Sequence, residues 1–263
     1  MRAGLFPGQG SQTPDMPIDT AAQQPAILRL SIRSFRNAGI ACDVFAGHSL
    51  GSYSAMVAAG ALEADDAERI VTVRGQAMAD AGREQAGGMI ALLGCSIDSA
   101  RGLAEQFGLT VANDNAPGQI VLSGAVAAVD AIEQAEPTAS DDSGTERRVR
   151  LKRLPVSGAF HSPLIESAAV RLADEIATTE FGDASTVIAN GSAQPYADPG
   201  RELVSELLSP VRFRESLLYM WDRGVREFVE FEPAGVLTGL VKRTLPEAKA
   251  FKVSDLVAAS ESP

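Results

Sequence analysis

The sequence has few of the residues that build metal sites and disulfide frameworks. Its 263 residues include two cysteines, Cys42 and Cys95, and two histidines, His48 and His161. Two cysteines without metal-type spacing exclude a cysteine-rich zinc site and a multi-disulfide scaffold, and both are expected to be small buried thiols. The sequence therefore predicts no metal, no redox cofactor and a reducing, cytoplasmic setting.

Basic charge and long apolar segments are also scarce. The formal net charge is −11, which argues against a nucleic-acid partner. The densest basic cluster, Arg147–Arg153, alternates with apolar residues and is typical of a solvated strand face. The sequence contains no run of eighteen apolar residues, so no membrane span is predicted. Residues 1–7 lack the apolar core of a signal peptide. We expect no membrane partner.

A G-x-S-x-G motif at Gly47–Gly51 is the most informative feature that is present. A short apolar run at Cys42–Ala46 predicts a buried strand before it, and Leu50–Ala59 predicts a helix after it. Strand, sharp turn and helix form the context of a nucleophile elbow. Ser49 would then lie at a helix N-terminus, where free N–H groups stabilise negative charge. An ordinary glycine-rich turn remains the alternative for these five residues.

Strands alternate with helices in both outer parts of the chain, which predicts an α/β domain with a parallel sheet. The first helix is expected to carry Pro25 in its first turn. The expected strands are Ala3–Phe6, Cys42–Ala46, Thr186–Ala189, Phe228–Phe231 and Ala250–Val253, and the expected helices are Pro25–Asn37, Leu50–Ala59, Asp65–Asp80, Pro163–Ile176, Phe213–Arg223 and Val236–Arg243.

The middle of the chain has the order β-α-β-β-α-β, which predicts a ferredoxin-like unit. Gly87-Gly88 and Pro155 would link it to the rest, and the polar segment Pro137–Arg147 is expected to be a mobile loop. We predict a large domain of residues 1–86 and 155–263, an inserted subdomain of residues 87–154, and a ligand cleft at their junction. The expected elements are strands at Met89–Leu93, Leu109–Ala112, Ile120–Ser123 and Arg148–Leu154, and helices at Ile97–Phe107 and Val126–Ala135.

A serine nucleophile needs a general base, and the chain offers two histidines. His48 directly precedes Ser49, and neighbouring side chains at a strand end point to opposite faces. Packing behind the elbow is therefore favoured for His48. His161, in a loop that enters a helix, remains as the candidate base, with a buried structural histidine as the alternative.

Four motifs in order resemble the malonyl-CoA:acyl carrier protein transacylase family. They are Phe6–Gln12 (F-P-G-Q-G-S-Q), Gly47–Gly51 (G-H-S-L-G), Val73–Gly75 (V-R-G) and Gly158–Ser162 (G-A-F-H-S), and the similarity extends through Pro233–Leu240. The resemblance implies an α/β-hydrolase-like domain with a ferredoxin-like insertion. It also implies an acyltransferase with malonyl-CoA as substrate, an acyl carrier protein as partner and no cofactor.

The resemblance implies a role for each motif in acyl transfer. Ser49 would attack the thioester carbonyl, and His161 would take the serine proton and return it to the leaving thiol. The backbone N–H groups of Gln9 and Leu50 would form the oxyanion hole.

Substrate recognition is also implied by the resemblance. Arg74 would hold the malonyl carboxylate through a bidentate pair that a lysine cannot copy. Phe160 would exclude a branched methylmalonyl group. Asn115, with Asn113, would lie near the cleft, although asparagines are also common in turns.

The chain departs from the family at three places. Only Thr13–Gln23 remains of a longer, mostly helical segment, so part of the wall beside the site is expected to be absent. Ser52 replaces a glutamate that commonly follows the elbow. Glu206 aligns with a glutamine whose main-chain carbonyl orients the histidine; alternatively, the Glu206 side chain itself orients His161.

The sequence thus predicts a ping-pong transfer of malonyl from CoA to Ser49 and then to a phosphopantetheine thiol, as used in fatty acid and polyketide synthesis. A serine thioesterase or other hydrolase shares the elbow but does not need Arg74 or the Gln9 loop. A shortened family member that serves as a non-catalytic binding module is the third hypothesis.

Overall fold

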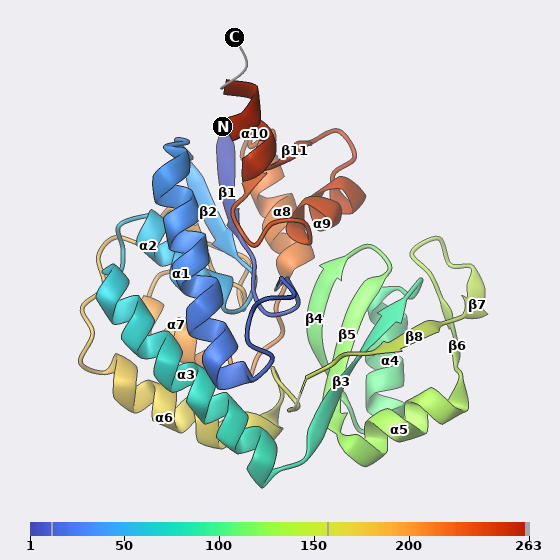
Figure 1. Cartoon of the computed structure of the whole chain (residues 1–263). Coiled ribbons are helices and arrows are strands. Elements are labelled where there is room, and N and C mark those ends of the chain that lie inside the picture. The colour runs from blue at the N-terminus through green and yellow to red at the C-terminus, as the bar shows by residue number, and fades with distance from the viewer. Residues whose placement is uncertain (12, 157, 261–263) are drawn as a thin grey trace.

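Two sheets organise the chain in a computed structural model that describes residues 1–11, 13–156 and 158–260 (Figure 1). The larger sheet is parallel and has the strand order β11-β10-β1-β2-β9. Its strands are β1 (Arg2–Phe6), β2 (Val44–Gly47), β9 (Val187–Ile188), β10 (Glu227–Glu230) and β11 (Lys249–Lys252).

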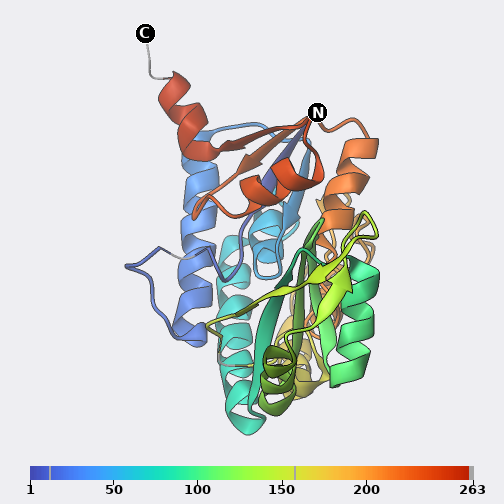
Figure 2. The ribbon, with the colours of Figure 1, turned by 90° about the vertical axis from the view of Figure 1, so that its right-hand side faces the viewer.

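Side chains of β1 alternate between two hydrophobic cores, as the period of a strand requires. Ala3 and Leu5 pack on one face with helices α8 (Phe213–Asp222) and α9 (Leu237–Thr244). Phe6 packs on the other face with helices α1 (Thr20–Ala38) and α2 (Gly51–Ala58). Figure 2 shows α1 and α8 on opposite sides of the sheet. The helices outside the smaller sheet are α1 (Thr20–Ala38), α2 (Gly51–Ala58), α3 (Ala64–Glu84), α6 (Glu166–Ile176), α7 (Pro199–Ser205), α8 (Phe213–Asp222), α9 (Leu237–Thr244) and α10 (Val253–Ser260), with a 3-10 turn, η1, at Pro163–Ile165.

The smaller sheet is antiparallel and has the strand order β4-β5-β3-β8. One face packs against helices α4 (Ile97–Phe107) and α5 (Val126–Ala135) through Ile90 and Leu92. The other face adds Met89 and Ala91 to the core of the larger unit. The sheet is therefore held against the rest of the molecule by its own apolar face. Its elements are β3 (Gly87–Leu93), α4 (Ile97–Phe107), β4 (Thr110–Ala116), β5 (Gln119–Ala125), α5 (Val126–Ala135) and β8 (Arg150–Arg153).

The expected position of Pro25 in the first helix is wrong. Helix α1 begins at Thr20, because the Asp19 carboxylate accepts hydrogen bonds from the backbone N–H groups of Ala21 and Ala22. This side-chain cap satisfies free N–H groups that start a helix. Pro25 therefore lies inside α1, where it removes one backbone donor.

Two expected loop segments instead form strands. Gly87 and Gly88 pair with β5 as the first residues of β3 and do not form a linker. The expected mobile loop at Pro137–Arg147 contains a hairpin of β6 (Thr138–Ser140) and β7 (Glu146–Arg148). The Asp141 carboxylate accepts N–H bonds across its turn, so a polar composition here reflects turn chemistry.

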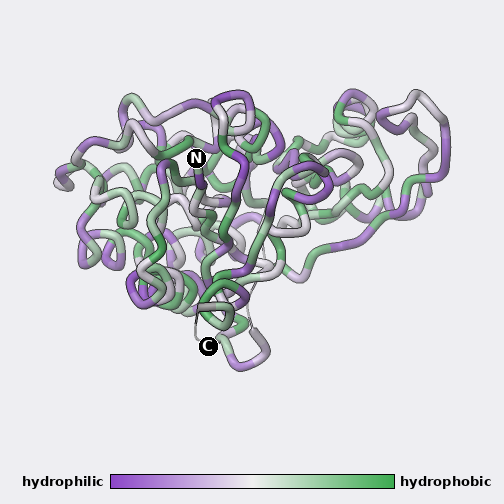
Figure 3. The backbone as a smooth tube through the Cα atoms, turned by 90° about the horizontal axis from the view of Figure 1, so that it is seen from above, coloured by the Kyte–Doolittle hydropathy of each residue, from purple (hydrophilic) through white to green (hydrophobic). Residues whose placement is uncertain are grey.

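Apolar segments are concentrated inside the molecule, and hydrophilic segments lie toward its surface (Figure 3). Cys95 is buried and Cys42 is half-buried, and burial raises the pKa of each thiol to about 11, as expected for unreactive thiols. Among the described residues, no helix has the length and apolar character needed to cross a bilayer.

Candidate active site

The G-x-S-x-G motif forms a sharp turn between β2 and α2. Ser49 has a φ of +52°, a left-handed conformation that is uncommon for a residue other than glycine. A Cβ on Gly47 would lie 1.9 Å from the backbone carbon of Gly51, so only glycine permits this close approach. The Ser49 N–H donates to Oδ1 of Asn190 at 3.0 Å, and this hydrogen bond to a distant segment stabilises the turn. The predicted elbow is present.

His161 stands opposite the nucleophile in the orientation of a general base. Its Nε2 lies 2.9 Å from Ser49 Oγ, and its Nδ1 lies 2.8 Å from the Glu206 carbonyl oxygen and 3.1 Å from the Ser209 carbonyl oxygen. Carbonyl oxygens only accept hydrogen bonds, so Nδ1 carries the proton. Nε2 is therefore the unprotonated nitrogen that can accept the Ser49 proton.

Burial and the Arg74 guanidinium lower the pKa of His161 to about 4. The imidazole is thus neutral across the physiological range and ready to accept a proton. We expect the final loss of Ser49 acylation on acidification to follow a pKa near 4, because a protonated Nε2 cannot act as a base. Quenched-flow measurement of acylation after short pH jumps tests this; a final acid limb near 6.5 would contradict the buried, desolvated base.

The His48 side chain lies beside Asn115, whereas the Ser49 hydroxyl lies beside His161. The Nε2 of His48 lies 2.7 Å from Oδ1 of Asn115, and its ring packs against Phe213 with centroids 5.3 Å apart. The prediction that His48 packs behind the elbow agrees with these contacts. Asn115 and Asn113 lie in β4 rather than in a turn, and the Asn115 amide is directed to His48. A substrate role for Asn115 stays a prediction.

Glu206 presents its main chain, not its carboxylate, to His161. Its side chain accepts hydrogen bonds from the Tyr196 hydroxyl and from the Asn190 N–H. The alternative in which the Glu206 side chain orients the base is wrong. A main-chain contact explains why a glutamate can stand where a glutamine was expected.

The loop that carries Gln9 lies against the backbone of the elbow. A Cβ on Gly8 would lie 2.3 Å from the His48 carbonyl oxygen and 3.6 Å from the Leu50 nitrogen. Within the described part of the chain, the N–H groups of Gln9 and Leu50 have no acceptor, so both remain available to an oxyanion. Gln12 of the first motif, and Ser157 before the His161 motif, lie outside the described residues.

Arg74 is a buried cation beside the nucleophile. Its Nη2 donates to Ser49 Oγ at 3.0 Å, and its Nη1 donates to Oε1 of Gln24 at 2.7 Å. The side chain is 2% exposed, and burial lowers the pKa of the guanidinium, which nevertheless stays charged. In residues 1–11, 13–156 and 158–260, no carboxylate forms an ion pair with Arg74. The cation is therefore placed to receive an anion next to Ser49.

A groove of about 450 Å³ lies between the larger and the smaller unit and reaches His161. Arg101 and Leu109 of the smaller unit face Pro163 and Leu208 of the larger unit across it. A predicted cleft at this junction therefore agrees with the structure. Phe160, by contrast, is buried in the main core with its ring against Gly158, and its selection against branched acyl groups stays a prediction.

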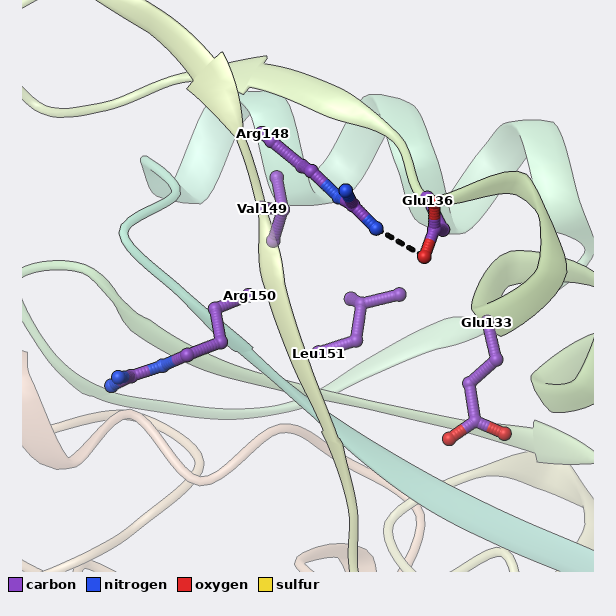
Figure 4. Close-up of a pocket in the computed structure, with 6 residues that line it drawn as sticks. All are labelled: Glu133, Glu136, Arg148, Val149, Arg150 and Leu151. Carbon is purple, nitrogen blue, oxygen red and sulfur yellow. Dashed lines mark ion pairs between the residues drawn. The ribbon is translucent and has the colours of Figure 1, made fainter.

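A second groove lies on the outer side of the smaller unit and contains none of the predicted site residues (Figure 4). Arg148 pairs there with Glu136, and Arg153 pairs with Asp130 and Glu133. The basic cluster is exposed and largely matched by nearby acids, which agrees with the predicted solvated strand face.

Comparison with known proteins gives a direct test of the family resemblance. Residues 18–261 match the family described as acyl transferase domain. The chain belongs to this family. It is 38% identical over 244 residues to the malonyl CoA-acyl carrier protein transacylase of Bacillus subtilis, covering 88% of this chain and 75% of the relative. The enzyme of the same name from Escherichia coli K12 is 33% identical, with 96% of each chain covered.

Solved structures of acyl transferases also share the fold. The chain superposes on the crystal structure of MCAT from Streptococcus pneumoniae with a TM-score of 0.87 and 33% identity, covering 99% of each chain. A type II polyketide acyl-carrier protein in complex with its malonyl-transacylase gives a TM-score of 0.88 at 29% identity, with 98% coverage of each chain. Both support the mixed α/β fold with a parallel sheet.

The sequence did not predict two residues that complete the site. Gln24, at the start of a Q-P dipeptide, bonds both Gln9 and Arg74 and so joins the first and third motifs. Asn190 holds Ser49 from a segment 141 residues away. Neither position stands out in a single sequence, because asparagine and glutamine are common in loops and helices.

Proposed function

We propose that this protein transfers a malonyl group from CoA to an acyl carrier protein, as an [acyl-carrier-protein] S-malonyltransferase. The buried cation carries this proposal. Arg74 lies 3.0 Å from the nucleophile and has no carboxylate partner in the described residues, although an unpaired buried charge is costly. A malonyl carboxylate would supply the missing anion at the distance that brings its thioester to Ser49.

In the first half-reaction, Ser49 Oγ attacks the thioester carbonyl carbon while its proton moves to His161 Nε2. The tetrahedral oxyanion accepts hydrogen bonds from the N–H groups of Gln9 and Leu50. As the intermediate collapses, the carbon–sulfur bond breaks and the thiolate takes the proton from His161. Free CoA and a malonyl ester on Ser49 result.

The second half-reaction runs the same steps with a new thiol. The phosphopantetheine thiol of the carrier protein gives its proton to His161 and attacks the Ser49 ester. The carbon–oxygen bond then breaks, and Ser49 regains the proton. The groove between the two units reaches His161 and would admit the phosphopantetheine arm. The proposed chemistry requires no metal or redox cofactor.

The names of related proteins support an acyl carrier protein as the partner and fatty acid or polyketide synthesis as the pathway class. Several act as malonyl CoA-acyl carrier protein transacylases, one is a polyketide biosynthesis protein, and one solved structure contains a carrier protein. We assign malonyl-CoA and an acyl carrier protein to this chain, in fatty acid or polyketide synthesis. A cytoplasmic location is part of this proposal.

The two sheets support a division into two domains. The parallel sheet, with its serine elbow after β2, supports an α/β-hydrolase-like domain of residues 1–86 and 155–263. The antiparallel order β4-β5-β3-β8 with α4 and α5 on one face supports a ferredoxin-like insertion of residues 87–154.

Transfer to a carrier protein separates this function from its alternatives. With malonyl-CoA and a carrier that bears its phosphopantetheine arm, we expect malonyl-carrier protein and free CoA, measured by mass spectrometry. The same carrier without the arm is the control and should gain nothing. Release of malonate at the same rate with either carrier would instead support a thioesterase, and absence of any reaction would support a binding module.

A further inference from the structure

Gln23 is a buried glutamine beside Gln9 to which the proposed chemistry gives no role. The residue lies in the first turn of α1 and is 4% exposed. Its Oε1 accepts a hydrogen bond from Gln9 Nε2 at 2.9 Å, and its Nε2 donates to the Pro17 carbonyl oxygen at 2.8 Å. The Gln23 amide thus joins Gln9 to residues 13–19, which lie in the shortened segment before α1.

Gln23 is the last of three glutamine amides in a row that begins at Arg74. Nη1 of Arg74 donates to Gln24 Oε1 at 2.7 Å, and Gln24 Nε2 donates to Gln9 Oε1 at 3.0 Å. Gln9 then donates to Gln23, and Gln23 donates to Pro17. A guanidinium only donates hydrogen bonds and a carbonyl oxygen only accepts them, so the two ends of the row fix the orientation of every amide between them.

The Gln9 side chain is therefore held at both of its polar atoms. Gln24 donates to its oxygen, and Gln23 accepts from its nitrogen. The Thr20 hydroxyl lies 3.5 Å from the same nitrogen, which is beyond the usual length of a hydrogen bond. Because the side chain is fixed, movement of the Gln9 backbone is restricted, and the N–H of that backbone is a proposed oxyanion donor.

We propose that Gln23 is a positioning residue for the oxyanion hole, because it holds the Gln9 side chain against the shortened segment and so keeps the Gln9 N–H in place. The inference rests on the proposed function, which assigns this N–H to the thioester oxyanion. An oxyanion donor acts only when it points at the developing charge, and a displacement of about 1 Å can cost a hundredfold in rate. The shortened segment thereby contributes an anchor for the site.

The test replaces Gln23 with methionine, which keeps the length of the side chain and removes both hydrogen bonds. We expect single-turnover acylation of Ser49 to fall about tenfold to a hundredfold. The fall should be similar for malonyl-CoA and acetyl-CoA, because both present the same thioester carbonyl to the oxyanion hole. A defect in carboxylate recognition would instead lower malonyl loading far more than acetyl loading.

Ser31→Ala is the matched control for the loss of a buried hydrogen bond in α1. Ser31 is fully buried, and its hydroxyl donates to the Glu232 carbonyl oxygen at 2.7 Å, so this contact involves no residue of the proposed site. Ser31→Ala should lower the thermal stability to an extent similar to Gln23→Met. It should nevertheless keep the wild-type acylation rate.

A double-mutant cycle with Gln9→Met separates positioning from a general loss of stability. Gln9→Met removes the side chain that Gln23 holds and keeps the backbone N–H. In that background Gln23→Met should have little further effect on acylation, because the connection is already broken. If Gln23→Met does not fold, Gln23→Asn is too short to reach both partners and should give a smaller fall with the same malonyl-to-acetyl ratio.

Three results would overturn the proposal. They are wild-type acylation in folded Gln23→Met, independent and additive effects of the Gln9 and Gln23 substitutions, and a loss confined to malonyl, which would place the effect at Arg74. Failure of the wild type to form an acyl-enzyme with malonyl-CoA would instead overturn the proposed function.

Discussion

Replacing Ser49 with alanine is expected to abolish covalent malonyl loading and to lower malonyl transfer by about 10⁴-fold or more. The substitution removes only the Oγ atom that His161 and Arg74 both contact. The N–H groups of Gln9 and Leu50, the proposed oxyanion donors, remain, so substrate binding should persist. The loss should therefore appear in the rate of transfer rather than in the affinity for malonyl-CoA.

A serine in the helix that follows the elbow provides the control for this substitution. Ser54 is buried in α2, and its hydroxyl has no hydrogen-bond partner among the described residues. Ser54→Ala should form the adduct at the wild-type rate and should keep the thermal stability. An adduct that persists in Ser49→Ala, seen by intact-protein mass spectrometry, would place the nucleophile elsewhere.

Replacing Arg74 with alanine is expected to lower malonyl loading by about 10²- to 10³-fold and acetyl loading far less. This loss corresponds to about 3–4 kcal/mol, the lower part of the range for breaking a buried ion pair, here between the guanidinium and the malonyl carboxylate. Acetyl has no carboxylate, so it cannot lose this interaction. The ratio of the two loading rates, measured by quenched flow on the same preparation, isolates the effect of the carboxylate.

The matched variant for this experiment is Arg74→Lys. A lysine keeps the charge but not the planar fork that also reaches Gln24, so malonyl loading should fall to an intermediate value. Equal losses for malonyl and acetyl in Arg74→Ala would contradict the carboxylate clamp. Such a result would mean that Arg74 acts on Ser49 or on the packing of α3 rather than on the substrate.

Sequence patterns located the elbow because its turn depends on local rules. Glycines at 47 and 51 are required by the close approach of the backbone, and a serine between a strand and a helix follows from that turn. His161 emerged because the chain has only one other histidine. Periodicity likewise located the strands of both sheets, since alternation and apolar runs are properties of the segment itself.

Long-range hydrogen bonds could not be predicted in the same way. Asn190 and Glu206 reach Ser49 and His161 from segments more than forty residues away, and no local pattern marks them. Asp19 set the start of α1 by a side-chain cap, which outweighed the expectation from Pro25. The hairpin at β6 and β7 was missed because polar strands that pair at a surface lack the apolar alternation used to detect strands.

In the proposed mechanism, Ser49 carries the malonyl group between two thiols. The most direct measurement is to load the enzyme with malonyl-CoA, locate the ester by peptide mass spectrometry, and then follow its discharge with and without phosphopantetheinylated carrier protein. We predict an ester on Ser49 that moves to the carrier much faster than it is lost to water. An ester at another residue, or discharge to malonate at a rate that the carrier does not change, would contradict the account.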